Sequence, residues 1–115
     1  MSILRSGAYW LEFQSNLNTK GIGTLVVNGP RLTGGDGGYL YRGFVTGFGG
    51  VYRGRVAVIR VDPNAISLFG SVERFDLEIS GLAMGSKIAF SGFVRGAEHL
   101  RVRFSLRLAA AMAAE

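Results

Sequence analysis

The chain carries few side chains that could perform catalytic chemistry. His99 is the single histidine among 115 residues, and cysteine is absent. A structural zinc site takes its four ligands mainly from these two residue types, so the sequence predicts no metal site. A serine–histidine–aspartate triad stays formally open, although no Gly-x-Ser-x-Gly motif is present. We expect His99 to lie exposed in a turn rather than in an active site.

The carboxylates do not form an obvious catalytic pair either. A glycosidase needs two of them facing each other across a cleft. Glu12, Asp76 and Glu78 fall on the expected outward faces of strands, and nothing in their spacing brings two of them together. The sequence therefore predicts a protein that is not an enzyme, with no catalytic residues and no cofactor.

The glycine-rich segment 34–38 could in principle hold a phosphate through its backbone N–H groups. It lacks the Gly-Lys-Ser/Thr ending of a P-loop, and no helix pattern follows it. We therefore interpret it as a turn in which Asp36 accepts hydrogen bonds from its own loop backbone.

Basic residues give the chain a net charge of +5. Five arginines share strand faces: Arg53 and Arg55 on one strand, and Arg101, Arg103 and Arg107 on another. Such faces can bind phosphates, but nucleic-acid sites on sheets usually add aromatic platforms. Phe104 lies on the opposite face from its neighbouring arginines. We interpret these faces as solvated surface, which argues against nucleic acid as a partner.

The elements that must position these residues follow a hydrophobic period of two, which is typical of antiparallel strands with one buried face. It predicts strands over residues 9–14, 21–28, 31–33, 39–46, 51–62, 74–80, 87–95 and 100–108. Turns are expected at residues 16–20, 28–30, 34–38, 47–50, 81–86 and 96–99. We also expect a bulge near Ala57, where the charges change parity. One helical turn is expected within 63–70, with Asp62 as its N-cap.

About eight sequential strands with short connections predict an all-β domain, an antiparallel up-and-down barrel with at most one short helix. An open sandwich is the alternative. Glycine makes up 18 of the 115 residues, and the glycines within strands favour the curvature of a closed barrel. We expect one domain over residues 1–115, with 1–6 and 109–115 peripheral or frayed.

Strand parity separates inward from outward side chains. The inward set would line the lumen, either filling it or contacting a small apolar ligand: Tyr9, Leu11, Phe13, Tyr41, Phe75, Leu77, Phe90, Val94, Leu100, Val102 and Phe104. Four large apolar residues fall on the outward parity: Trp10, Leu40, Phe44 and Phe93. Together they could form a surface for a dimer or a protein partner, unless a glycine bulge shifts the parity.

Residues 1–7 include no apolar signal-peptide core, and no apolar run reaches the ~18 residues of a membrane helix. The absence of cysteine fits a reducing compartment. We therefore expect a cytoplasmic protein without a membrane association.

A series of short motifs resembles the GrlR family of type III secretion negative regulators. It consists of Gly7-x-Tyr9, Phe13, Gly21-x-Gly23, Asn28-Gly29, Thr33-Gly34-Gly35-Asp36 and Tyr41-x-Gly43, followed by Val94-Arg95-Gly96 and Glu98. The resemblance covers roughly residues 5–108, and its specificity lies in the order and spacing of the motifs.

The resemblance implies an eight-stranded calycin/lipocalin-like barrel, often a homodimer, with an apolar interior suspected of holding a lipid-like ligand. It also implies a bacterial regulator that sequesters a transcriptional activator through protein contact, without catalysis. One departure concerns the acidic run that the family carries after the strand matching Tyr41-x-Gly43. Residues 46–50 contain no carboxylate here, and Arg53 and Arg55 follow. No partner-binding residues are therefore carried over to this segment.

Overall fold

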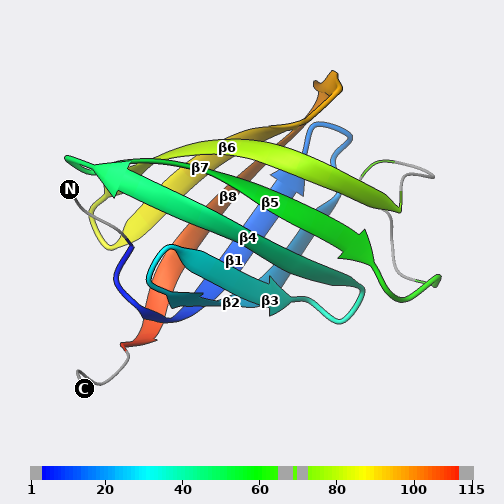
Figure 1. The fold of residues 1–115 in the computed structure, drawn as a ribbon. Helices are drawn as coiled ribbons and strands as arrows, with labels where there is room; N and C mark the ends of the chain where they lie inside the picture. The colour runs from blue at the N-terminus through cyan, green and yellow to red at the C-terminus, as the bar shows by residue number, and fades with distance from the viewer. Residues whose placement is uncertain (1–3, 65–68, 70–72, 112–115) are drawn as a thin grey trace.

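A computed structural model describes residues 4–64, 69 and 73–111, which form a closed antiparallel β-barrel (Figure 1). Its strands are β1 (Gly7–Ser15), β2 (Lys20–Asn28), β3 (Arg31–Gly35), β4 (Tyr39–Phe48), β5 (Val51–Arg60), β6 (Arg74–Met84), β7 (Lys87–Val94) and β8 (Ala97–Ala111). Each strand pairs with the next, and β8 pairs with β1. This last pairing confirms the up-and-down barrel and excludes the open sandwich.

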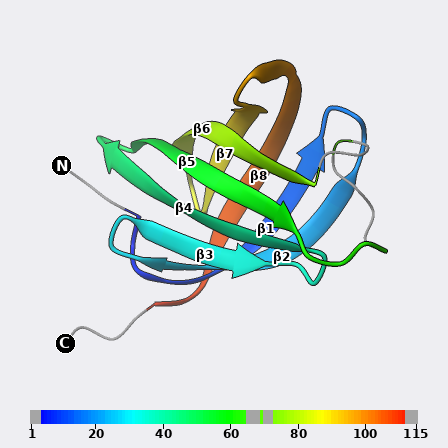
Figure 2. The ribbon, with the colours of Figure 1, turned by 45° about the vertical axis from the view of Figure 1, so that its right-hand side comes forward.

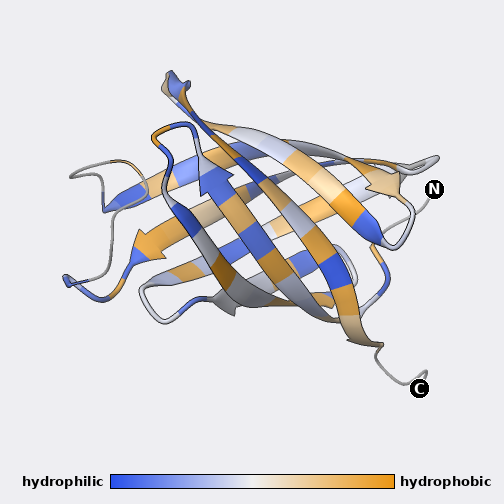
Figure 3. Ribbon diagram, turned by 180° about the vertical axis from the view of Figure 1, so that it is seen from behind, coloured by the Kyte–Doolittle hydropathy of each residue, from blue (hydrophilic) through white to orange (hydrophobic). Residues whose placement is uncertain are grey.

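Hydrophobic and hydrophilic residues alternate along several strands (Figure 3), and buried and exposed residues alternate in the same way, most regularly along β6 and β7. All eleven residues of the predicted inward set are buried or pack against the core. Leu106, Val27, Val45 and Val58 are among the most completely buried side chains. The four outward apolar residues are exposed, so the parity assigned from the sequence is correct at all fifteen positions.

Two inward glycines let β4 and β5 approach closely as the barrel wall curves. A Cβ on Gly43 would lie 2.1 Å from the carbonyl oxygen of Arg55. A Cβ on Gly54 would lie equally close to the carbonyl oxygen of Phe44. Any side chain would force these two backbones apart, which supports the expected link between strand glycines and barrel closure.

Several turns are shorter than expected, because left-handed glycines reverse the chain within two residues. Gly49 and Gly50 have φ values of 65° and 82° between β4 and β5, and Gly85 and Gly96 reverse the next two hairpins. Glycines that we expected in turns therefore lie in strands: Gly34 and Gly35 in β3, Gly47 in β4 and Gly81 in β6. His99 likewise lies in β8 rather than in a turn, although it is exposed.

The expected bulge near Ala57 is wrong. The pairing of β5 is continuous on both sides, and Ala57 lies opposite Arg42 and Asp76. The alternation along β5 places Arg60 on the inner face. However, this residue lies at the end of the barrel, where its Nη2 donates to the carbonyl of Pro63 at 2.8 Å. The register shifts occur instead at Ala8/Tyr9 in β1 and at Phe93/Val94 in β7.

Side chains outside the strands cover the two ends of the barrel. Leu4 is fully buried, so part of the segment expected to be peripheral belongs to the core. At the opposite end, Phe69 is buried with its ring edge-on to Phe75, at a centroid distance of 5.2 Å. The helical turn expected within 63–70 lies largely outside the described residues. Figure 2 shows the β7–β8 hairpin rising above the rest of the barrel.

Candidate functional site

The cavity found inside the barrel, among the residues that the structure describes, is small. It measures about 50 Å³, with a wholly apolar lining that includes Leu11, Tyr41 and Phe104. Sites for small organic ligands usually measure about 300–1,000 Å³. The inward side chains thus fill the lumen, as they commonly do in barrels of this strand number. Ligand contact by the predicted inward residues stays a prediction.

A buried phenol and a carboxylate hold the β3–β4 turn. The Tyr41 hydroxyl donates to Asp36 Oδ2 at 2.6 Å, while Asp36 Oδ1 accepts from the backbone N–H groups of Gly38 and Tyr39. This geometry confirms the predicted role of Asp36 within its own loop. Burial, followed by the contact with Asp36, raises the pKa of Tyr41 far above its ordinary value of 10.0. The phenol therefore stays protonated, and its hydrogen bond to Asp36 stabilises the β3–β4 turn.

The four outward apolar residues separate into two surfaces. Trp10 and Leu40 share one transverse row of paired residues, in which only Thr24 and Gly35 stand between them. We call the surface around this row the outer apolar face; its large side chains are Trp10, Ile22, Val26 and Leu40. Trp10 is 60% exposed and Ile22 is 76% exposed.

Ile22 and Val26 were missed in the sequence because β2 carries apolar residues on both faces. Leu25 and Val27 point inward on the same strand. An alternation between apolar and polar residues is therefore absent there, and only the pairing register reveals which residues are outward.

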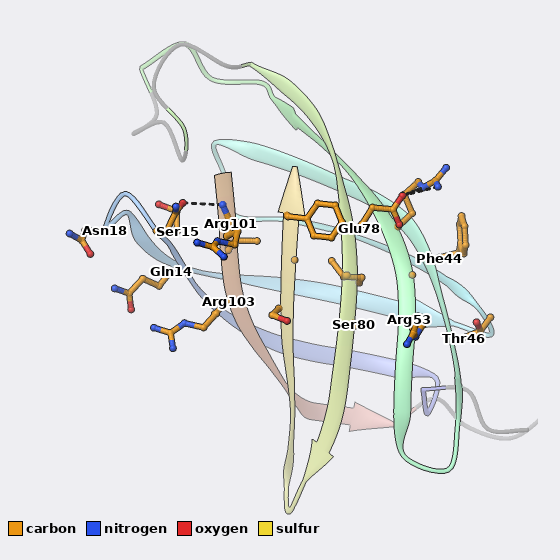
Figure 4. A pocket seen from close by; sticks show the side chains of 18 residues that line it. Gln14, Ser15, Asn18, Phe44, Thr46, Arg53, Glu78, Ser80, Arg101 and Arg103 are labelled. Atoms are coloured by element: carbon orange, nitrogen blue, oxygen red, sulfur yellow. Dashed lines mark hydrogen bonds and ion pairs between the residues drawn. The ribbon is translucent and has the colours of Figure 1, made fainter. Parts of the chain in front are cut away.

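Phe44 and Phe93 lie on a different part of the barrel, in a groove of about 940 Å³ on its outer surface (Figure 4). Two transverse rows of paired residues cross this groove. One row reads Arg55, Glu78, Phe93 and Arg101, and the other reads Arg53, Ser80, Ser91 and Arg103. Both rows run from β5 through β6 and β7 to β8, and Phe44 on β4 pairs with Arg55. We call this surface the basic groove.

The basic groove has an excess of positive charge. Arg55 binds Glu78, with Nη2 2.8 Å and Nε 3.1 Å from the same carboxylate oxygen. Both side chains are more than 30% exposed, so water screens this ion pair. Among the described residues, no carboxylate pairs with the other three groove arginines: Arg53, Arg101 and Arg103.

The β1–β2 turn braces one wall of this groove. Asn16 Oδ1 accepts from the backbone N–H of Arg101 at 3.0 Å, and Asn16 Nδ2 donates to the carbonyl of His99 at 2.8 Å. Ser15 Oγ accepts from the backbone N–H groups of Leu17 and Thr19 within the turn. These hydrogen bonds tie the start of β8 to the β1–β2 turn.

The carboxylates that the sequence offered as a catalytic pair point away from the barrel interior. Glu12, Asp76 and Glu78 lie on the outer surface, and Glu78 is occupied by its arginine partner. No group of three His, Cys, Asp or Glu side chains within the described ranges could hold a metal ion. The same ranges contain no helix that is long and apolar enough to cross a membrane.

Comparison with known families gives a match over almost the whole chain. The model of the family described as the T3SS negative regulator GrlR matches residues 4–112. Curated proteins give no significant match. The matched segment includes all eight strands and both surfaces described above. The chain therefore belongs to the GrlR family of negative regulators of type III secretion.

Proposed function

We propose that this protein is a non-enzymatic cytoplasmic regulator that represses type III secretion genes by sequestering a transcriptional activator. The observation that carries this proposal is the match of residues 4–112 to a family of negative regulators of this system. The distribution of side chains agrees with action by protein contact. The lumen is filled, while large apolar and charged side chains lie on the outer surface.

The family resemblance implies an acidic segment that contacts the activator, but this chain has no acidic residues at the corresponding positions. The segment that follows the middle of β4, residues 46–50, contains no carboxylate. Arg53 and Arg55 lie beyond it on β5, within the basic groove. A partner recognised here would need to present negative rather than positive charge.

The proposed function predicts a specific phenotype in the native host. Deletion of the gene should raise the transcripts of type III secretion genes several-fold, since the activator is released, and expression from a plasmid should reverse the change. The measurement is quantitative reverse-transcription PCR. A fall in these transcripts upon deletion, or no change, would contradict a repressive role.

We further propose that the protein is a homodimer assembled through the outer apolar face. A closed barrel has no free sheet edge, so two copies cannot join by pairing strands. They must associate through side chains. The row from Trp10 to Leu40 contains no charged residue, so it could form the apolar centre of the contact. Glu12, opposite Ile22, and Arg107, opposite Trp10, would lie at the rim of this contact.

The dimer can be tested by sedimentation velocity. Trp10→Glu and Ile22→Glu should each convert dimers to monomers, since each buries a carboxylate in the apolar contact. Phe93→Glu, in the basic groove, serves as the matched control and should leave the dimer intact. A wild-type protein that sediments as a monomer at high concentration would refute the dimer. Dissociation by the Phe93 variant alone would place the contact elsewhere.

The carrier function, with a small apolar ligand in the lumen, stays an alternative prediction. The cavity of about 50 Å³ counts against it. A ligand of ordinary size would require several inward side chains to move apart.

A further inference from the structure

We propose that the basic groove binds an acidic amphipathic helix of a protein partner. This inference rests on the proposed function, because it assigns the surface and the chemistry through which an activator would be held. The groove is lined by four arginines and a single glutamate, and its volume is about 940 Å³. The groove therefore favours a ligand that carries negative charge.

Arg53 and Arg55 lie on β5, and Arg101 and Arg103 lie on β8. One pair of arginines therefore lies on each side of β6 and β7. Arg53 faces Arg103 across Ser80 and Ser91, and Arg55 faces Arg101 across Glu78 and Phe93. The two arginine-bearing strands are three strand spacings apart, or about 14 Å along the sheet. An α-helix with its side chains is about 10–12 Å wide, so it fits between the two pairs.

The spacing along each strand also suits a helix. Arg53 and Arg55 are two residues apart on β5, which places them about 6.7 Å from each other. Arg101 and Arg103 have the same spacing on β8. Carboxylates four residues apart on a helix are separated by about 6 Å along its axis. A helix lying along the strands could therefore offer carboxylates to Arg53, Arg101 and Arg103, whose planar guanidinium groups suit this contact. Arg55 already binds Glu78.

The centre of the groove carries a single charged group among the described residues, the Glu78 carboxylate, and Arg55 neutralises it. Ser80 and Ser91 are small, and the ring of Phe93 is 38% exposed beside them. Phe44 is 51% exposed at the β4 margin. The apolar face of an amphipathic helix between the arginine-bearing strands would cover Phe93 and the two serines, while its acidic flanks meet the arginines. Phe44 lies outside this span, beyond Arg55.

Single-stranded nucleic acid fits this arrangement less well. Phe44 and Phe93 are three strands apart, about 14 Å along the sheet, so they do not form a platform for successive bases. The Glu78 carboxylate lies between them in the same row. A phosphodiester chain carries a charge at each nucleotide and would place one near this carboxylate, whereas an amphipathic helix presents its uncharged face there.

The test uses a fluorescein-labelled amphipathic peptide of about five helical turns, with leucines on one face and glutamates on both flanks. Binding to the full chain is measured by fluorescence anisotropy. We expect the acidic peptide to bind at least about tenfold more tightly than the same peptide with lysines in place of glutamates. It should also bind more tightly than a labelled thymidine oligonucleotide. Equal or stronger binding of either competitor, or no binding of the acidic peptide, would overturn the proposal.

Two pairs of substitutions separate the groove from overall charge. Arg53→Glu with Arg101→Glu should weaken acidic-peptide binding at least about tenfold. The control, Arg74→Glu with Lys87→Glu, makes the same change in net charge outside the groove and should have an effect below about twofold. Equal losses in both would show attraction by net charge only and would overturn the site. Circular dichroism checks that each variant is folded. Arg103→Glu alone is a second, milder variant of the groove and should also weaken binding of the acidic peptide.

Transcript measurements in the native host distinguish this inference from the proposed function. If wild-type protein represses and the Arg53/Arg101 double variant represses equally well, the regulatory role stands and the groove assignment falls. If wild-type protein does not repress, the proposed function falls, and peptide binding alone decides whether the groove binds acidic helices.

Discussion

Leu106→Ala is expected to lower the free energy of unfolding by about 2–5 kcal/mol. Leu106 lies on β8 and is 1% exposed, so its truncation leaves a void in the filled lumen. The neighbouring strands are tied into a closed barrel and can collapse only partly into this space. Urea denaturation followed by circular dichroism measures the change.

Leu82→Ala is the matched control, because it removes the same atoms from a side chain on β6 that is 54% exposed. Its expected cost is below about 1 kcal/mol. Similar losses in the two variants would contradict a packed lumen as the main source of stability. A small loss at Leu106 would indicate that the interior is loose enough to adapt, and this result would favour the carrier function.

Asp36→Ala is expected to cost about 3 kcal/mol of folding free energy, measured in the same way. The carboxylate accepts three hydrogen bonds, two from backbone N–H groups and one from the Tyr41 hydroxyl. Its removal leaves a buried phenol without its acceptor and releases the turn that leads into β4. The largest structural effect should therefore appear at the β3–β4 turn.

Asp76→Ala provides the control for this substitution, since Asp76 is exposed on the outer face of β6. Its effect should stay within about 0.5 kcal/mol. Tyr41→Phe adds a second measurement. The raised pKa of Tyr41 means that its stabilisation is present below pH 10 and is lost as the pH rises above this value. Wild-type protein should therefore lose stability more steeply above pH 10 than Tyr41→Phe; equal slopes would refute a role for this phenol.

Turn lengths and irregularities could be predicted only approximately from the sequence. A glycine in a β protein can reverse the chain, kink a strand or make room for a neighbouring backbone. The sequence pattern does not distinguish Gly43 from Gly49. In the structure, Gly43 lies inside β4, whereas Gly49 adopts a left-handed turn conformation. The charge of Arg60 suggested a bulge, whereas its position at the end of the barrel lets an inward side chain reach polar groups. Local patterns cannot distinguish these cases because they depend on the partner strand.

The sequence by itself determined the architecture and the direction of the side chains on those strands where apolar and polar residues alternate. A period of two allows only two faces, and eight short sequential strands favour closure, so the core and the exposed aromatics follow directly. Only the tertiary structure decided which outward residues share a surface. Arg53 and Arg103 are fifty positions apart in the chain, and the pairing of β5 through β8 places them in one row. Trp10 and Phe93 have the same outward parity, but the barrel places them on separate surfaces, because strand order and register set the neighbours of every outward side chain.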